Sequence, residues 1–218
     1  MEELHEGFAV YTDAAGERAL RDRFPAASAS DVAEGWDDAW RAFHHGVVVG
    51  RLWVGPPWEA PPPAVEAVVI DPGRAFGTGA HPTTRLCLEL LQEVRPTSIL
   101  DVGCGSGVLS IAAARLGFAP VVAVDVDPAA VDATLANART NGLEVPAHRA
   151  DALADELPET AVVVANIALE AVESLLARVE APCIITSGYL ERDIPAAAGR
   201  RRVARRTAGG WAADLLCS

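Results

Sequence analysis

A glycine-rich segment, Asp101-Val102-Gly103-Cys104-Gly105-Ser106-Gly107, directly follows an apolar run and precedes a helical pattern. Glycine lets a backbone turn sharply and approach a ligand closely. Dinucleotide sites carry G-x-G-x-x-G in this position, whereas the spacing here is G-x-G-x-G with an acid two residues before the first glycine. We therefore expect Gly103 and Gly105 to line a cofactor pocket, and Asp101 to face a cationic end of the ligand rather than a pyrophosphate.

Two further acids follow the next predicted strands. Asp125 ends one of them, where a carboxylate can accept both ribose hydroxyls of a nucleoside, and the ends of successive parallel strands meet at the ligand-binding edge of such a sheet. Asp151 follows the next strand, where it could accept from an adenine amino group. Each acid alone could equally be a loop carboxylate or a helix N-cap, and for Asp127 we prefer the N-cap. Together they indicate a nucleoside with a positively charged tail and no phosphate, S-adenosylmethionine.

Asn166 ends a later strand at the same predicted edge. Its amide oxygen, among backbone carbonyls, can accept N–H bonds from an incoming amine and align the nitrogen lone pair for in-line attack on a sulfonium methyl, which is catalysis by positioning. The alternative is that Asn166 only caps the following helix.

A sheet of parallel strands is needed to position these side chains. Short apolar strands separated by helices form such sheets, with right-handed crossovers. Strands are predicted at 47–54, 65–70, 98–102, 121–125, 161–166 and 183–187. Helices are predicted at 83–93, 108–116, 129–140 and 169–179. The tail, 201–217, reads as a hairpin, and we expect its arginines to form the solvated face of an edge strand. The expected fold is α/β and Rossmann-like, a mostly parallel seven-stranded sheet with an antiparallel C-terminal strand.

The composition indicates an ordinary soluble globular protein, with 50% hydrophobic and 22% charged residues among 218. No uncharged apolar run is long enough to span a membrane, and the acidic N-terminus differs from a secretory signal, so we expect a cytoplasmic protein without a membrane partner. A net charge of −12 argues against DNA as a partner and is compatible with a basic protein substrate. The four cysteines, at 87, 104, 183 and 217, lack metal-ligand spacing, so we expect small core residues in a reducing compartment and no metal.

A second loop rich in glycine and proline precedes the first helix of this pattern, and read alone it could close over a cofactor or be a structural turn. Its sequence, D-P-G-R-A-F-G-T-G-A-H-P-T-T at 71–84, closely resembles the ribosomal protein L11 methyltransferase family, as do D-V-G-C-G-S-G at 101–107, V-D-V-D-P at 124–128 and V-V-A-N-I at 163–167. The aromatic spacing at 35–44 also resembles the linker helix of that family.

The resemblance implies transfer of methyl groups from S-adenosylmethionine to the α-amine and lysine ε-amines of ribosomal protein L11. Cofactor contacts would fall on Thr84, Gly103, Asp125 and Asn166. Phe76, Thr78 and His81 would lie on a loop that covers cofactor and substrate. His81 is a candidate general base, although a lone histidine in such a loop is more often a hydrogen-bonding anchor.

The family begins with a compact substrate-recognition domain, and only 46 residues precede the predicted sheet here. We expect a truncated recognition module with a linker helix at 1–46, a connecting strand and proline-rich linker at 47–63, and the methyltransferase domain at 64–218. Two other functions stay open: a methyltransferase for another protein lysine or a small amine, and a non-catalytic protein that binds S-adenosylmethionine.

Overall fold

The computed structural model describes residues 2–4, 7–9, 20, 23–24, 44–71 and 79–218. The chain divides into two compact units, Met1–Arg41 and Ala42–Ser218. In the first, β1 (Glu2–Leu4) and β2 (Gly7–Ala9) form an antiparallel pair. The linker helix expected within 35–44 lies outside the described residues except at its last position.

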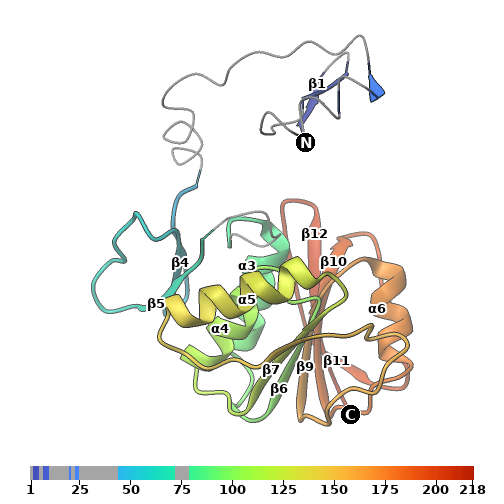
Figure 1. The fold of residues 1–218 in the computed structure, drawn as a ribbon. Helices are drawn as coiled ribbons and strands as arrows, with labels where there is room; N and C mark the ends of the chain where they lie inside the picture. The colour runs from blue at the N-terminus through green and yellow to red at the C-terminus, as the bar shows by residue number, and fades with distance from the viewer. Residues whose placement is uncertain (1, 5–6, 10–19, 21–22, 25–43, 72–78) are drawn as a thin grey trace. The chain divides into compact units, whose positions relative to one another are not determined.

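A seven-stranded sheet forms the centre of the second unit (Figure 1). Its strands are β6 (Ile99–Val102), β7 (Val121–Asp125), β8 (Ala147–Arg149), β9 (Val162–Asn166), β10 (Cys183–Leu190), β11 (Arg201–Ala208) and β12 (Trp211–Cys217). The strand order is β11-β12-β10-β9-β6-β7-β8. The pairs from β10 to β8 are parallel, and β12 is antiparallel to both of its neighbours. The expected fold class and its antiparallel C-terminal strand are confirmed.

Helices cover both faces of this sheet (Figure 1). They are α3 (Pro82–Leu91), α4 (Val108–Arg115), α5 (Pro128–Thr140) and α6 (Leu169–Leu176). Successive strand residues point to opposite faces, and in β9 Val162 and Val164 join a core with α3, α4 and α5, while Val163 and Ala165 join a core with α6. Asp127 is the N-cap of α5, since its side chain accepts from the backbone N–H of Ala129, which confirms the preferred interpretation of that acid.

A second, three-stranded sheet corrects two expectations. It contains β3 (Val47–Val49), β4 (Leu52–Gly55) and β5 (Glu66–Val69) in that order. The single strand expected at 47–54 is therefore a hairpin, which turns at Gly50 with a φ of +58° that suits glycine. The strand expected at 65–70 pairs with β4 instead of joining the large sheet. Its place among the seven strands of the large sheet is taken by β8, whose sequence Ala-His-Arg contains no apolar run from which a strand could be located.

The proline-rich stretch between β4 and β5 is attached to the start of this unit through Glu59. Its carboxylate accepts from the backbone N–H of Gly46 at 2.6 Å, and the Nδ1 atom of His45 lies 2.7 Å away. These contacts hold the pKa of Glu59 below its ordinary value, and the hydrogen bond from the Gly46 backbone has the larger effect.

Two arginines of the hairpin, Arg202 and Arg205, bind a buried carboxylate, which corrects the expected solvated face for these two residues. Asp214 on β12 is fully buried and pairs with Arg202 at 2.7 Å and Arg205 at 2.8 Å. The hydroxyl of Tyr189 on β10 donates to the same carboxylate at 3.0 Å. This network joins three adjacent strands, so we assign those arginines a structural role.

Two cysteines also differ from expectation. Cys183, the first residue of β10, is paired across the sheet with Cys217, the last of β12, and the two form a disulfide with Cα atoms 4.2 Å apart. The two cysteines are 34 residues apart, and the sequence does not indicate that they pair. They meet because the register of β10 and β12 places them opposite each other. Cys87 and Cys104 are free and buried, as expected of small core residues.

Candidate active site

The glycine-rich loop between β6 and α4 is bound to the end of β7. The backbone N–H of Gly103 donates to the Val124 carbonyl at 2.9 Å, and that of Gly105 donates to Oδ2 of Asp125 at 3.0 Å. Gly103 has a φ of +74°, a conformation that glycine adopts without penalty. The loop therefore presents its backbone directly beside the carboxylate expected to bind ribose.

A cavity of about 440 Å³ opens at this carboxyl edge of the sheet. It is of the size that small-molecule ligands occupy. Of the residues expected to bind the cofactor, six line it: Thr84, Gly103, Gly105, Asp125, Asp151 and Asn166. They come from α3 and from the ends of four strands, β6, β7, β8 and β9. The fold therefore brings together residues that are up to 82 positions apart in the sequence. No arginine or lysine is among the described residues that line the cavity.

Both carboxylates also organise their own loops. Asp125 accepts from the backbone N–H of Asp127 through Oδ1, and Asp151 accepts from that of Leu153, at 3.0 and 2.9 Å. The loop-carboxylate interpretation thus holds for each acid. It does not exclude ligand binding, because each carboxylate oxygen can accept more than one hydrogen bond.

Two apolar residues of the cavity were not predicted. Val126 and Leu153 line it while 59% and 39% exposed. Each lies one or two positions after an acid that was expected to bind the cofactor, and this proximity in sequence could have indicated them as lining residues. Their side chains offer an apolar surface of the kind that a planar base contacts.

Asp101 is 1% exposed and does not line the cavity. Burial raises its pKa from the ordinary 3.8 to about 6, although the hydroxyl of Ser110 donates to Oδ2 at 2.6 Å and favours the charged form. Its other oxygen, Oδ1, is buried and has no hydrogen-bond partner among the described residues. Asp101 is therefore a buried acid of which one oxygen, Oδ1, has no hydrogen-bond partner in the described part of the chain.

Asn166 is held by α3. Its amide nitrogen Nδ2 donates to the buried hydroxyl of Thr84 at 3.4 Å. Its amide oxygen accepts no hydrogen bond from the described part of the chain. The N-cap of α6 is Ala168, so Asn166 does not cap that helix, and the alternative of a simple cap is wrong.

His81 anchors the start of α3. It is the N-cap residue, and its Nδ1 atom accepts from the backbone N–H of Thr83 at 3.3 Å. Its ring packs edge-on against Trp211, with centroids 5.0 Å apart. The anchoring role considered for this histidine is thus observed. Phe76 and Thr78 lie outside the described residues.

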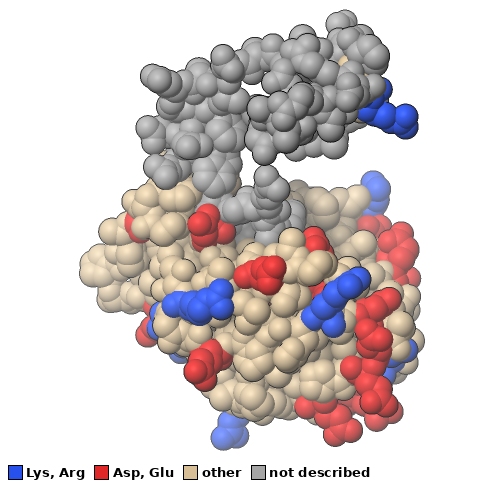
Figure 2. All heavy atoms as spheres, viewed as in Figure 1, with Lys and Arg blue, Asp and Glu red and all other residues tan. Residues whose placement is uncertain are grey.

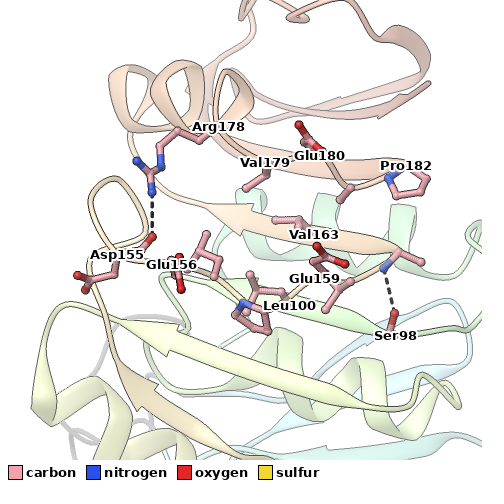
Figure 3. Close-up of a pocket in the computed structure, with 15 residues that line it drawn as sticks. Ser98, Leu100, Asp155, Glu156, Glu159, Val163, Arg178, Val179, Glu180 and Pro182 are labelled. Carbon is pink, nitrogen blue, oxygen red and sulfur yellow. Dashed lines mark hydrogen bonds between the residues drawn. The ribbon is translucent and has the colours of Figure 1, made fainter.

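A larger cavity, about 580 Å³, opens at the opposite, amino-terminal edge of the strands (Figure 3). Its rim carries the carboxylates Asp155, Glu156, Glu159 and Glu180. Arg178 donates to the Asp155 carbonyl at 2.8 Å and so helps to close the rim. This cavity holds none of the predicted site residues and no glycine loop, so we place the cofactor site in the smaller one.

The sheet order and the glycine loop define a Rossmann-like α/β domain of the methyltransferase class. The crystal structure of ribosomal protein L11 methylase from Lactobacillus delbrueckii subsp. bulgaricus matches with a TM-score of 0.72 and 31% identity, over 79% of this chain and 97% of that chain. A tRNA (uracil-54, C5)-methyltransferase of Pyrococcus abyssi, solved with S-adenosyl-L-homocysteine, shares the fold with a TM-score of 0.57 and 15% identity, over 79% of this chain and 44% of that one.

The family model for ribosomal protein L11 methyltransferase matches residues 9–196. The chain belongs to this family, as the sequence resemblance implied. A ribosomal protein L11 methyltransferase of Dechloromonas aromatica (strain RCB) is 50% identical over 148 residues, covering 66% of this chain and 49% of the relative. One of Shewanella piezotolerans (strain WP3 / JCM 13877) is 47% identical over 128 residues, 57% of this chain and 42% of the relative. The chain thus spans about half the length of the curated relatives it matches.

Among the described residues, no helix has the length and apolar character that crossing a membrane requires.

Proposed function

We propose that the protein transfers methyl groups from S-adenosylmethionine to amino groups of ribosomal protein L11, the α-amine, lysine ε-amines or both. The main support for this proposal is that Asp125 and Asp151, which could bind a nucleoside, line the same cavity as Asn166. Family membership and the names of the L11 methylase relatives support the choice of substrate.

The residues of the cavity fit this cofactor. Asp125 can accept the ribose hydroxyls, Asp151 the adenine amino group, and the exposed Val126 and Leu153 can contact the base. Asp101 lies outside the cavity lining, so it would favour the cationic tail through its negative charge two residues before Gly103 and not by direct contact. Two carboxylates, Asp125 and Asp151, and no cationic side chain of the described residues line the cavity, and this charge favours a ligand without phosphate over a pyrophosphate.

When bound, S-adenosylmethionine would supply an electrophilic methyl group on a sulfonium. Asn166 would accept an N–H of the acceptor amine through its amide oxygen, while Thr84 holds the amide nitrogen. A rigidly held acceptor fixes the direction of the amine lone pair, which is how positioning accelerates a displacement.

The amine must be neutral to react. A free lysine amine has a pKa of about 10.4 and an α-amine about 7.7–8.0, and removal from water in the pocket lowers either value. His81 uses Nδ1 to cap α3, so we assign release of the proton to solvent water.

The acidic character of the protein supports a basic partner. Acidic side chains gather on the side of the domain where α6 lies (Figure 2). Glu170, Glu173 and Glu180 on and after this helix are exposed, and the net charge is −12. Such a surface favours approach of a positively charged protein.

The test is transfer of labelled methyl from S-adenosylmethionine to purified L11, with Asn166→Ala as the control. We expect the wild type to label L11 and the variant to bind S-adenosylhomocysteine without labelling it. Undiminished labelling by the variant would refute the role of Asn166. Cofactor binding without labelled L11 would point to another protein lysine or a small amine. Failure with every amine tried would leave a non-catalytic binding protein.

A further inference from the structure

The segment that carries Asn166 is in direct backbone contact with an irregularity in β10. Asn166 pairs with Ser187 across the parallel strands, and the next residue, Ile167, donates its backbone N–H to the Ser187 carbonyl at 3.1 Å. The pairing of β10 with β12 shifts register between Ser187 and Tyr189. Gly188 lies at this bulge with a φ of +101°.

A side chain has no room at Gly188. A Cβ built there would overlap the carbonyl oxygen of Ile167 and lie 2.7 Å from its carbonyl carbon. These are backbone atoms, so the overlap could be relieved only by moving the chain next to Asn166. On the other side, a Cβ at Gly103 would overlap Cγ2 of Ile167. Ile167 therefore lies tightly between the cofactor loop and the β10 bulge.

The bulge itself is firmly held. Ser187 is fully buried, and its hydroxyl donates to the Ala212 carbonyl of β12 at 2.7 Å. On the other side of Gly188, the Tyr189 hydroxyl contacts the hydroxyl of Thr186 at 2.8 Å and Asp214 at 3.0 Å. A substitution at Gly188 would therefore displace Ile167 rather than the bulge.

We propose that Gly188 is a positioning residue for methyl transfer, which acts through the Ile167 backbone to fix the place of Asn166 beside the cofactor loop. This inference rests on the proposed function. Asn166 and Ile167 line the cofactor cavity and Gly188 does not. A change at Gly188 therefore acts first on the alignment of the acceptor amine, whereas Asp125 lies on β7, which is separated from β9 by β6.

The experiment compares Gly188→Ala with Gly199→Ala. Gly199 has a φ of +83° and open space around its missing Cβ, so both variants place alanine in a left-handed conformation and only Gly188→Ala adds the overlap. We expect kcat for L11 to fall about 100-fold in Gly188→Ala, the cost typical of a misplacement near 1 Å. The dissociation constant for S-adenosylhomocysteine should change far less than kcat, and Gly199→Ala should keep the wild-type kcat.

Ser187→Ala provides a second, milder variant should Gly188→Ala not fold, because it removes a single hydroxyl, which donates to the Ala212 carbonyl and also interacts with the Cys87 thiol. We expect it to lower kcat without weakening cofactor binding. Nitrogen–proton NMR of the S-adenosylhomocysteine complex should also show the Asn166 side-chain amide shifted in Gly188→Ala, or in Ser187→Ala, and unmoved in Gly199→Ala.

Wild-type kcat and an unmoved Asn166 amide in the folded variant would overturn the positioning role while the proposed function stands. A wild type that does not label L11 would overturn the proposed function instead, and the Asn166 resonance alone would then decide the role of Gly188.

Discussion

Replacement of Asp101 by asparagine tests whether this buried acid is kept for its ligand at a cost to stability. Asparagine keeps the shape and can still accept from Ser110, but it carries no charge to bury. We expect Asp101→Asn to make the ligand-free protein more stable at neutral pH and to weaken binding of S-adenosylmethionine.

The size of the effect follows from the pKa. In the folded protein burial raises the pKa of Asp101 from 3.8 to about 6, and at 1.36 kcal/mol per unit this costs about 3 kcal/mol of folding free energy at pH 7. The folded state binds the proton more tightly than the unfolded state. Stability of the wild type therefore declines as pH rises through the interval between the two pKa values, and Asp101→Asn lacks that decline.

Urea unfolding of ligand-free protein across that pH range measures the difference. The two free energies of unfolding should agree at the acid end and diverge toward neutral pH, with the variant the more stable. Asp127→Asn is the matched control, since Asp127 is an exposed N-cap and asparagine caps as well as aspartate does. Wild-type and Asp101→Asn curves that stay parallel from acid to neutral pH would refute the reasoning.

Two further substitutions test the surroundings of the site. Asp214→Ala should lower the free energy of unfolding by about 3–5 kcal/mol in denaturant titration, because it leaves two arginines without their buried partner; a loss below 1 kcal/mol would contradict the structural role of the network. Thr84→Val should lower kcat about 10-fold or more by releasing the Asn166 amide. Because Thr84 also lines the cofactor cavity, calorimetry should show a weaker affinity for S-adenosylhomocysteine as well, with kcat reduced by the larger factor. An unchanged kcat would count against this contact.

Local sequence was sufficient for much of the fold. Alternating apolar strands and helices predicted the central strands β6, β7, β9 and β10, and the helices α3 to α6 that the structure describes, to within a few residues. The reason is that periodicity, glycine turns and caps such as Asp127 are local properties of the chain. The same locality explains why the strand expected before Asp151, which is β8, could not be given bounds, since three residues without an apolar run carry no periodic signal.

The candidate site likewise has features that the sequence predicted and features that only the structure shows. Sequence order alone placed Gly103, Asp125 and Asn166 at strand ends, because parallel strands must present those ends at one edge. It could not show that Thr84 contacts Asn166 across 82 residues of chain, that Cys183 faces Cys217, or that Gly188 lies against Ile167. These contacts depend on strand register and on how a helix packs over the sheet. Only the tertiary structure decides them, because each needs residues far apart in sequence to be brought to within a few ångströms.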